Sequence, residues 1–159
     1  MITMTTVTLS VKQYEEDGVT HIDIEQTGTG GIKGSTERRT LDWNERETNS
    51  PIFGHIRGKS RWVSLSEIED PFLKEGFEDS LSATEGAKVI HALAITTANS
   101  SIAQQIWGFE IIDGQRYYVR HVIVEKEKEG VRREVKLVYD WQGDKSKTAT
   151  EEAEAPAEE

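Results

Sequence analysis

Apolar and polar residues alternate with a period of two along most of residues 1–143. The alternating segments are rich in Val, Ile, Thr, Tyr and Trp, and pairs such as Asp-Gly and Glu-Gly separate them. This pattern is typical of antiparallel strands joined by short turns. Eight strands are therefore expected, over residues 5–14, 19–27, 35–43, 52–65 with a break at Gly58, 89–98, 103–112, 115–127 and 131–141.

One helical segment is expected after Ser66, a capping residue, and Pro71 and Gly76 limit its length. A sheet of long strands with almost no helix has two exposed edges, and closure into a barrel removes both. The sequence therefore predicts an all-β fold, an antiparallel up-and-down β-barrel of about 8–10 strands with one short helical segment.

The Asp-Gly pairs at residues 17–18 and 113–114 fix two strand registers, because a two-residue loop determines which residues face each other. The first hairpin sets Glu16 opposite Val19 and has one apolar and one charged face. The second sets three pairs on one face: Ile111 with Arg116, Phe109 with Tyr118, and Trp107 with Arg120.

The strand over residues 131–141 extends this face whether two or four residues connect it. The resulting aromatic wall is interpreted as the barrel interior and contains Trp107, Phe109, Ile111, Tyr118, Val122, Val124, Leu137, Tyr139 and Trp141, with Arg116 and Arg120 set into it. The opposite face is too apolar to lie in water, so we expect either the segment 72–77 or a second copy of the chain, in a homodimer, to cover it.

Arg120 is the main functional candidate, because a cation inside an apolar wall must be paired or stacked. It stacks on Trp107, with or without an acidic partner, it anchors a ligand's carboxylate, phenolate or carbonyl, or it reaches water at the rim. Arg116 is expected at the rim, and Trp62 in the core. The predicted ligand-binding residues are Trp107, Phe109, Tyr118, Arg120, Tyr139, Trp141, Arg116 and Trp62.

Composition limits the classes of function. The chain has 159 residues, a net charge of −10 and no Cys, which excludes disulfides and thiolate chemistry and argues against a nucleic-acid partner. It has neither an apolar run of membrane-spanning length nor a signal-like N-terminus, so a cytoplasmic protein without a membrane partner is expected. Residues 1–143 are expected to form a single domain, and the acidic residues 144–159 a disordered tail.

Familiar catalytic and metal motifs are absent from the sequence. The four His residues lack zinc-binding spacing, although one His could bind haem axially, and there is no Gly-x-Ser-x-Gly. We therefore expect no metal and no cofactor, and no residue is assigned to catalysis. His91 would face Glu110 across a four-residue loop at 99–102, and the charged run 40–47 is interpreted as a solvated strand end.

The aromatic interior with its internal arginine resembles the calycin group of small-ligand barrels, which includes lipocalin-like and fatty-acid-binding-protein-like members. Residues 116–118, Arg-Tyr-Tyr, are similar to the Arg-x-Tyr carboxylate grip of the second group, but they lie one strand earlier. The resemblance implies an intracellular binding protein for a small hydrophobic ligand with an anionic or carbonyl group. The alternative is a cofactor-free isomerase or cyclase that uses the same pocket. A module that binds partners through its outer face is a third hypothesis.

Overall fold

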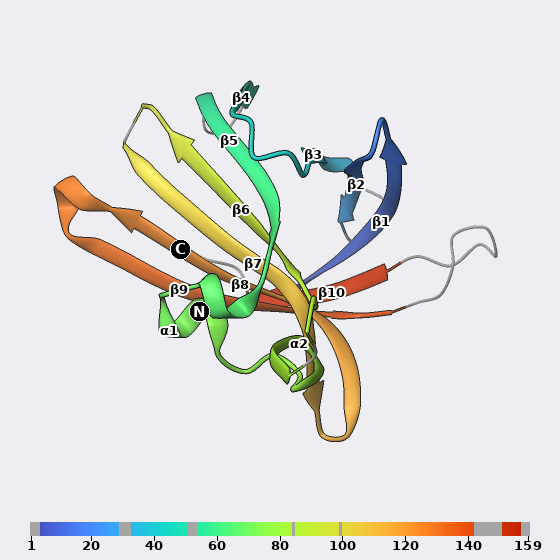
Figure 1. Cartoon of the computed structure of the whole chain (residues 1–159). Helices are drawn as coiled ribbons and strands as arrows, with labels where there is room; N and C mark the ends of the chain where they lie inside the picture. Colours follow the sequence, from blue (N-terminus) through green and yellow to red (C-terminus); the bar gives the residue numbers. More distant parts are fainter. Residues whose placement is uncertain are drawn as a thin grey trace.

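The computed structural model describes residues 4–28, 33–50, 54–83, 85–98, 100–141 and 151–156. These residues form one antiparallel sheet of ten strands, in the order β3-β2-β1-β10-β9-β8-β7-β6-β5-β4 (Figure 1). The strands are β1 (Met4–Glu16), β2 (Val19–Gly28), β3 (Lys33–Thr40), β4 (Arg46–Ser50), β5 (Gly54–Val63), β6 (Val89–Thr96), β7 (Ser101–Ile112), β8 (Gln115–Lys126), β9 (Val131–Asp140) and β10 (Glu151–Pro156).

Four short helical turns accompany the sheet: η2 (Leu65–Glu67), α1 (Pro71–Lys74), α2 (Ser80–Ala83) and η3 (Glu127–Glu129). Asp70 caps α1, since its carboxylate accepts hydrogen bonds from the backbone N–H groups of Phe72 and Leu73. Within the described residues, no helix is long and apolar enough to cross a membrane.

The all-β class and the eight predicted strands are confirmed, with ends that differ by a few residues. Two details are wrong. β5 continues through Gly58 without a break, and the charged residues Arg46–Ser50 form β4, an exposed edge strand that lacks the alternating pattern. Backbone pairing with β5 is enough to hold such a strand, so the apolar pattern did not indicate it.

The sequence also predicts a disordered tail over residues 144–159, whereas the structure has a strand, β10, at Glu151–Pro156. β10 pairs with β1 on one side and with β9 on the other. Two ladders of backbone hydrogen bonds thus order a segment that has no large apolar side chain. The rest of the predicted tail lies outside the described residues.

The sheet coils so that its two ends approach each other (Figure 1). β3 contacts β5, and the backbone N–H of Trp43, in the connection from β3 to β4, donates to the Ser60 carbonyl at 2.8 Å. In the part of the chain that the structure describes, no ladder joins β3 to β4 or β5. The closed barrel therefore stays a prediction.

Both hairpin registers follow the Asp-Gly turns as predicted. Glu16 faces Val19 in the first hairpin, and in the second the pairs are Ile111 with Arg116, Phe109 with Tyr118, and Trp107 with Arg120. Asp17 and Asp113 have φ angles of 53° and 51°, and each is followed by a glycine with positive φ. Left-handed backbone at both turn positions matches the twist of the flanking strands, and this geometry fixes the register.

The two faces of the sheet build two separate cores. The inner face, which carries Trp107 and Arg120, packs β6–β9 against β1 and β2 through Leu9, Ile22, Ile24, Leu41, Ile90, Trp107 and Tyr139. The outer face packs against the segment that follows β5, through Val63, Leu65, Ile68, Leu73, Phe77, Val89, Ile106, Val119 and Ile123. The prediction that residues 72–77 cover this face is confirmed, so its apolar character requires no second copy of the chain.

Gly108 in β7 lies where the outer core leaves no room for a side chain. A Cβ atom there would lie 2.9 Å from two ring carbons of Phe77 and 3.2 Å from Cγ1 of Val89. The buried Phe77 ring has little freedom to move, because it stacks on His121 with 4.1 Å between centroids. We expect Gly108→Ala to lower the free energy of unfolding by about 1–3 kcal/mol in urea denaturation.

Gly58→Ala is the matched control, since the nearest atom to a Cβ at position 58 is the Leu93 carbonyl oxygen at 3.4 Å, an ordinary contact. Its effect is expected to stay within about 0.5 kcal/mol. Equal losses for the two variants would contradict the tight packing of Phe77 against β7.

Candidate functional site

Arg120 lies at the centre of the inner face, on β8, and is only 2% exposed. It faces Trp107 of β7 on one side and Leu137 of β9 on the other. Its guanidinium carbon lies 3.9 Å from the ring centroid of Trp107, 5.7 Å from that of Tyr118 and 5.5 Å from that of Tyr139. Three electron-rich rings therefore surround a cation that has almost no contact with water.

The hydrogen bonds of Arg120 leave one of its nitrogens unused. Nε donates to the Tyr118 hydroxyl oxygen at 2.8 Å, and Nη1 donates to Oε1 of Glu37 at 3.4 Å. Nη2 is buried and has no hydrogen-bond partner. A buried donor without a partner carries a desolvation penalty that a bound acceptor would relieve.

Glu37 and Arg39 reach the same place from β3. Glu37 faces Ile24, so it points to the inner face, and Nη2 of Arg39 lies 3.5 Å from its Oε2. Burial acts to raise the pKa of Glu37, but Arg120 and Arg39 outweigh it and hold the pKa below its usual range. The carboxylate is therefore ionised, and the three groups together carry one positive charge.

Arg39, like Arg120, places its guanidinium over the Trp107 ring, but at a greater distance. Its guanidinium carbon lies 5.4 Å from the Trp107 ring centroid, and its Nε is buried without a hydrogen-bond partner. The indole N–H of Trp107 donates to Oε1 of Gln105 at 2.8 Å, which orients the ring that both arginines contact. The site thus holds two buried N–H donors that the described residues do not satisfy.

Tyr118 is a neutral phenol in this site. Burial raises its pKa, and the opposing effect of Arg120 is smaller. Its oxygen accepts from Arg120, and its ring stacks on Tyr139 with 5.1 Å between centroids. The hydroxyl proton is polarised by that bond and points away from Arg120, so it can serve as a further donor to a ligand.

The structure brings together four of the eight predicted ligand-binding residues: Trp107, Tyr118, Arg120 and Tyr139. Phe109 is 36% exposed and Trp141 73% exposed, so the prediction that they lie inside is wrong. Phe109 shares the face of Arg120, near the β7–β8 turn, and Trp141 comes directly after the end of β9. The strand register determines which face of the sheet a residue is on, but it does not determine which other strands cover that face.

Arg116 is exposed at the rim, as predicted, where Glu78 accepts two hydrogen bonds from it and its guanidinium carbon lies 3.8 Å from the Phe109 ring centroid. Trp62 does not enter the core. It is 37% exposed and donates its indole N–H to the hydroxyl of Thr20 on β2. Trp62 therefore links β5 to β2, because the coiling of the sheet brings these strands together.

Sequence reasoning missed Glu37 and Arg39. The register of β3 is irregular between Glu25 and Thr27, where a bulge shifts the pairing, and no Asp-Gly pair joins β2 to β3. Alternation within residues 37–39 does set both side chains on one face. Only the structure identifies that face as the inner one.

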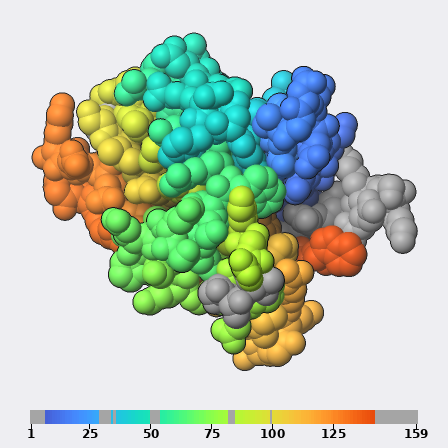
Figure 2. Space-filling view, in the orientation of Figure 1, coloured from blue at the N-terminus to red at the C-terminus, as the bar shows by residue number. Residues whose placement is uncertain are grey.

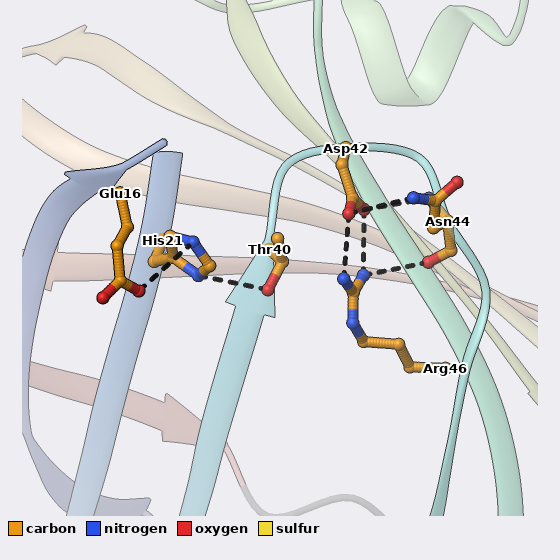
Figure 3. Close-up of polar contacts among 6 residues, drawn as sticks. All are labelled: Glu16, His21, Thr40, Asp42, Asn44 and Arg46. Carbon is orange, nitrogen blue, oxygen red and sulfur yellow. Dashed lines mark hydrogen bonds and ion pairs between the residues drawn. The ribbon is translucent and has the colours of Figure 1, made fainter. Parts of the chain in front are cut away.

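Within the charged run 40–47, residues 41–45 connect β3 to β4 and begin with a turn (Figure 3). Asp42 accepts two hydrogen bonds from Arg46, at 2.9 and 2.8 Å, and one from the Asn44 backbone N–H at 2.9 Å. The hydrogen bond from Arg46, which outweighs burial, holds the pKa of Asp42 far below its usual range. On β2, His21 lies 3.2 Å from the Thr40 hydroxyl. The contacts of Asp42 with Asn44 and Arg46 stabilise the connection between β3 and β4, and the separate contact of His21 with Thr40 links β2 to the end of β3.

His91 and His121 lie on the outer face, away from Arg120. His91 faces Ile106 and not Glu110, because the loop between β6 and β7 begins two residues earlier than expected. It accepts from Arg61 Nε and contacts Gln104 in a half-open cleft of about 290 Å³. Among the described side chains, no group of three or more His, Asp or Glu could hold a metal ion.

Stability is expected to fall as the pH drops from about 7 to about 5.5. Burial lowers the pKa of both His91 and His121 below the ordinary value. Both histidines stay neutral in the folded protein, but in the unfolded chain they bind protons below about pH 6.5. Protonation therefore favours the unfolded state, and the free energy of unfolding falls as the pH drops below that value. Urea denaturation across this range would measure the slope.

Replacing either histidine with glutamine is expected to reduce this slope. A slope that is the same in the wild type and in both buried-site variants would contradict the assignment.

The fold and the site define an all-β protein with a buried site of two guanidinium groups, a carboxylate and aromatic rings. No family model matches the chain, and no solved structure matches it. The chain is 36% identical over 129 residues to the probable pericyclase scpY of Mollisia scopiformis, a match that covers 79% of this chain and 64% of that protein. It is 31% identical over 141 residues to the pericyclase pydY of an Acremonium species, covering 86% of this chain and 72% of that protein.

The chain therefore belongs to the family of these pericyclases, and it spans just under two thirds of the length of the first. The sequence pattern alone favoured a binding protein, with an isomerase or cyclase as the alternative. The relationship to these pericyclases supports the alternative better.

Proposed function

We propose that this protein catalyses the pericyclic cyclisation of an apolar, polyunsaturated small molecule that carries a carbonyl or anionic group. The observation that carries the proposal is the buried guanidinium of Arg120, which lies among three aromatic rings and has a free N–H donor at Nη2. The names of the two relatives support the same class of reaction.

This chemistry suits the residues of the site. In an intramolecular pericyclic reaction, bonding electrons move around one cyclic transition state within a single molecule, so the product is an isomer of the substrate and no redox step is needed. A hydrogen bond to a carbonyl that is conjugated with a reacting alkene withdraws electron density from that alkene. Arg120 Nη2 supplies one such donor and the Tyr118 hydroxyl a second, in surroundings where water does not compete.

The aromatic side chains supply the second half of the proposed catalysis. A flexible polyene loses conformational freedom when its reacting ends come together, and a binding surface that holds the folded conformer removes that cost from the reaction step. The rings of Trp107, Tyr118 and Tyr139 offer broad apolar surfaces around the donor. We include in the proposal that the coiled sheet closes around the substrate as a calycin-like barrel, which the contact of β3 with β5 supports.

The test uses a synthetic acyclic compound that carries a conjugated diene and, along the same chain, an alkene conjugated to a ketone. With wild-type protein we expect conversion to a product of unchanged mass and reduced diene absorbance, followed by liquid chromatography with mass detection. The analogue whose ketone is reduced to an alcohol should not be accelerated, because it lacks the acceptor for Arg120.

Binding without conversion, seen as a change in tryptophan fluorescence while the mass and the diene absorbance both persist across a panel of such compounds, would contradict the proposal. It would favour a carrier instead.

A further inference from the structure

Besides Trp62, three large apolar side chains among the described residues are exposed: two near the β7–β8 turn, and one directly after the end of β9. Phe109 is 36% exposed, Ile111 51% and Trp141 73%. We call these three residues the apolar rim. The β7–β8 hairpin that carries Phe109 and Ile111 projects from the body of the protein at the bottom of the space-filling view (Figure 2, yellow-orange). Solvent-exposed aromatic and aliphatic surface that is continuous with a binding site commonly belongs to that site.

The rim continues the rows of side chains that surround Arg120. Phe109, Tyr118 and Tyr139 lie side by side across β7, β8 and β9. One step further along the strands, Ile111 faces Arg116, and Trp141 comes directly after the end of β9, two residues beyond Tyr139. Burial therefore decreases along these strands, from Arg120 to Ile111 and Trp141.

Arg116, which lies beside Phe109 on this surface, has its charge paired within the protein. Arg116 donates two hydrogen bonds to Glu78, each 2.9 Å long, and lies over the Phe109 ring at 3.8 Å. Its guanidinium stacks on the Phe109 ring, and Glu78 pairs with its charge there. The rim is thus suited to an uncharged, apolar group, whereas Arg120 at the inner end is suited to an anion or a carbonyl.

We infer that the apolar rim is the subsite for the distal end of an extended hydrocarbon chain whose carbonyl or anionic end binds Arg120. This inference rests on the proposed function, because it assumes that the substrate's polar group reaches Arg120. Four residues separate Arg120 from Arg116, or roughly 14 Å at about 3.4 Å per residue, the reach of a chain of about ten to twelve carbon atoms. The ligand class is a linear amphiphile of at least that length.

The experiment measures the affinities of octanoate, decanoate and dodecanoate for the full chain by isothermal titration calorimetry. For the wild type we expect tighter binding with each added pair of carbons, since a buried methylene contributes about 0.8 kcal/mol. Trp141→Ala is expected to weaken dodecanoate binding about tenfold and octanoate binding by about twofold or less, because only the longer chain reaches position 141.

Ile111→Ala should act in the same sense as Trp141→Ala. Its matched control is Ile112→Ala, since Ile112 is the next residue of β7 and points to the opposite face. Trp141 is exposed, so Trp141→Ala is expected to fold like the wild type. Circular dichroism checks the fold of this variant.

Equal weakening of all three fatty acids by Trp141→Ala, or an affinity that does not depend on chain length, would overturn the inference. So would Trp141→Ala converting a dimer to a monomer without changing binding, because a second copy would then occupy the rim. Arg120→Met separates this failure from that of the proposed function. If it weakens binding of every chain length while the rim variants do nothing, the anchoring role of Arg120 stands and only the rim subsite is wrong.

Discussion

Arg120→Met is expected to slow the proposed pericyclic cyclisation about 100-fold or more. Methionine keeps the length and apolar character of the side chain but removes every donor, including the unpaired Nη2. Loss of one preorganised donor to developing negative charge costs about 10²–10³ in rate. The rate constant for formation of the isomeric product, measured with protein in excess over substrate, would show this loss.

Stability should change little in Arg120→Met. Glu37 keeps Arg39 within 3.5 Å and a hydrogen bond from Gln26, so its carboxylate is not left alone. Removal of a buried cation also removes the cost of its desolvation. We expect the free energy of unfolding to change by less than about 2 kcal/mol.

Arg132→Met is the control, because it removes an exposed arginine from the opposite face of the sheet. It should leave the rate within about threefold of the wild type. If Arg120 instead serves only to lock Trp107 and Tyr139 in place, Arg120→Met will lower the melting temperature while the folded fraction reacts at the normal rate. That result would exclude Arg120 from the reaction.

Trp107→Ala is expected to lower the free energy of unfolding by about 3–5 kcal/mol, the largest effect on stability that we predict. The indole is 3% exposed and packs in the inner core with Leu9, Ile24 and Tyr139. Its removal leaves a cavity and also takes away the nearest ring from the Arg120 guanidinium, which then lies buried with fewer favourable contacts.

Trp141→Ala makes the matched comparison, since it deletes the same type of side chain at an exposed position. Its effect is expected within about 0.5 kcal/mol. Guanidinium denaturation of both variants gives the two values. Comparable losses would mean that the inner face is not covered by β1 and β2 at Trp107, and the assignment of the buried site would be wrong.

The register of the site could be predicted from the sequence because Asp113-Gly114 leaves a single pairing for the residues on both sides of it. Trp107, Tyr118, Arg120 and Tyr139 were found in this way, and the structure confirms their shared face. Period-two alternation identified eight strands for a similar reason, since in each of them the apolar side chains follow a fixed local geometry.

The parts that could not be predicted depend on contacts between distant segments. Glu37 pairs with Arg120 across 83 positions, and no turn of fixed length transmits the register of β8 to β3. The exposure of Phe109 and Trp141 depends on where covering strands end, which alternation does not encode. β10 carries almost no apolar signal, because the backbones of β1 and β9 hold it.

The position of β10 determines when the site can form during folding. Every other ladder in the described sheet joins strands that are consecutive in the chain, but β1 pairs with β10, with Met4 opposite Pro156. Local hairpins form quickly, whereas a contact of such high sequence separation forms late. Until β10 joins the two halves, β1–β3 have no ladder to β4–β9, and Glu37 on β3 has no fixed place beside Arg120 on β8. The Arg120 guanidinium therefore becomes buried among the last events of folding, after the β7–β8 hairpin that carries it has formed.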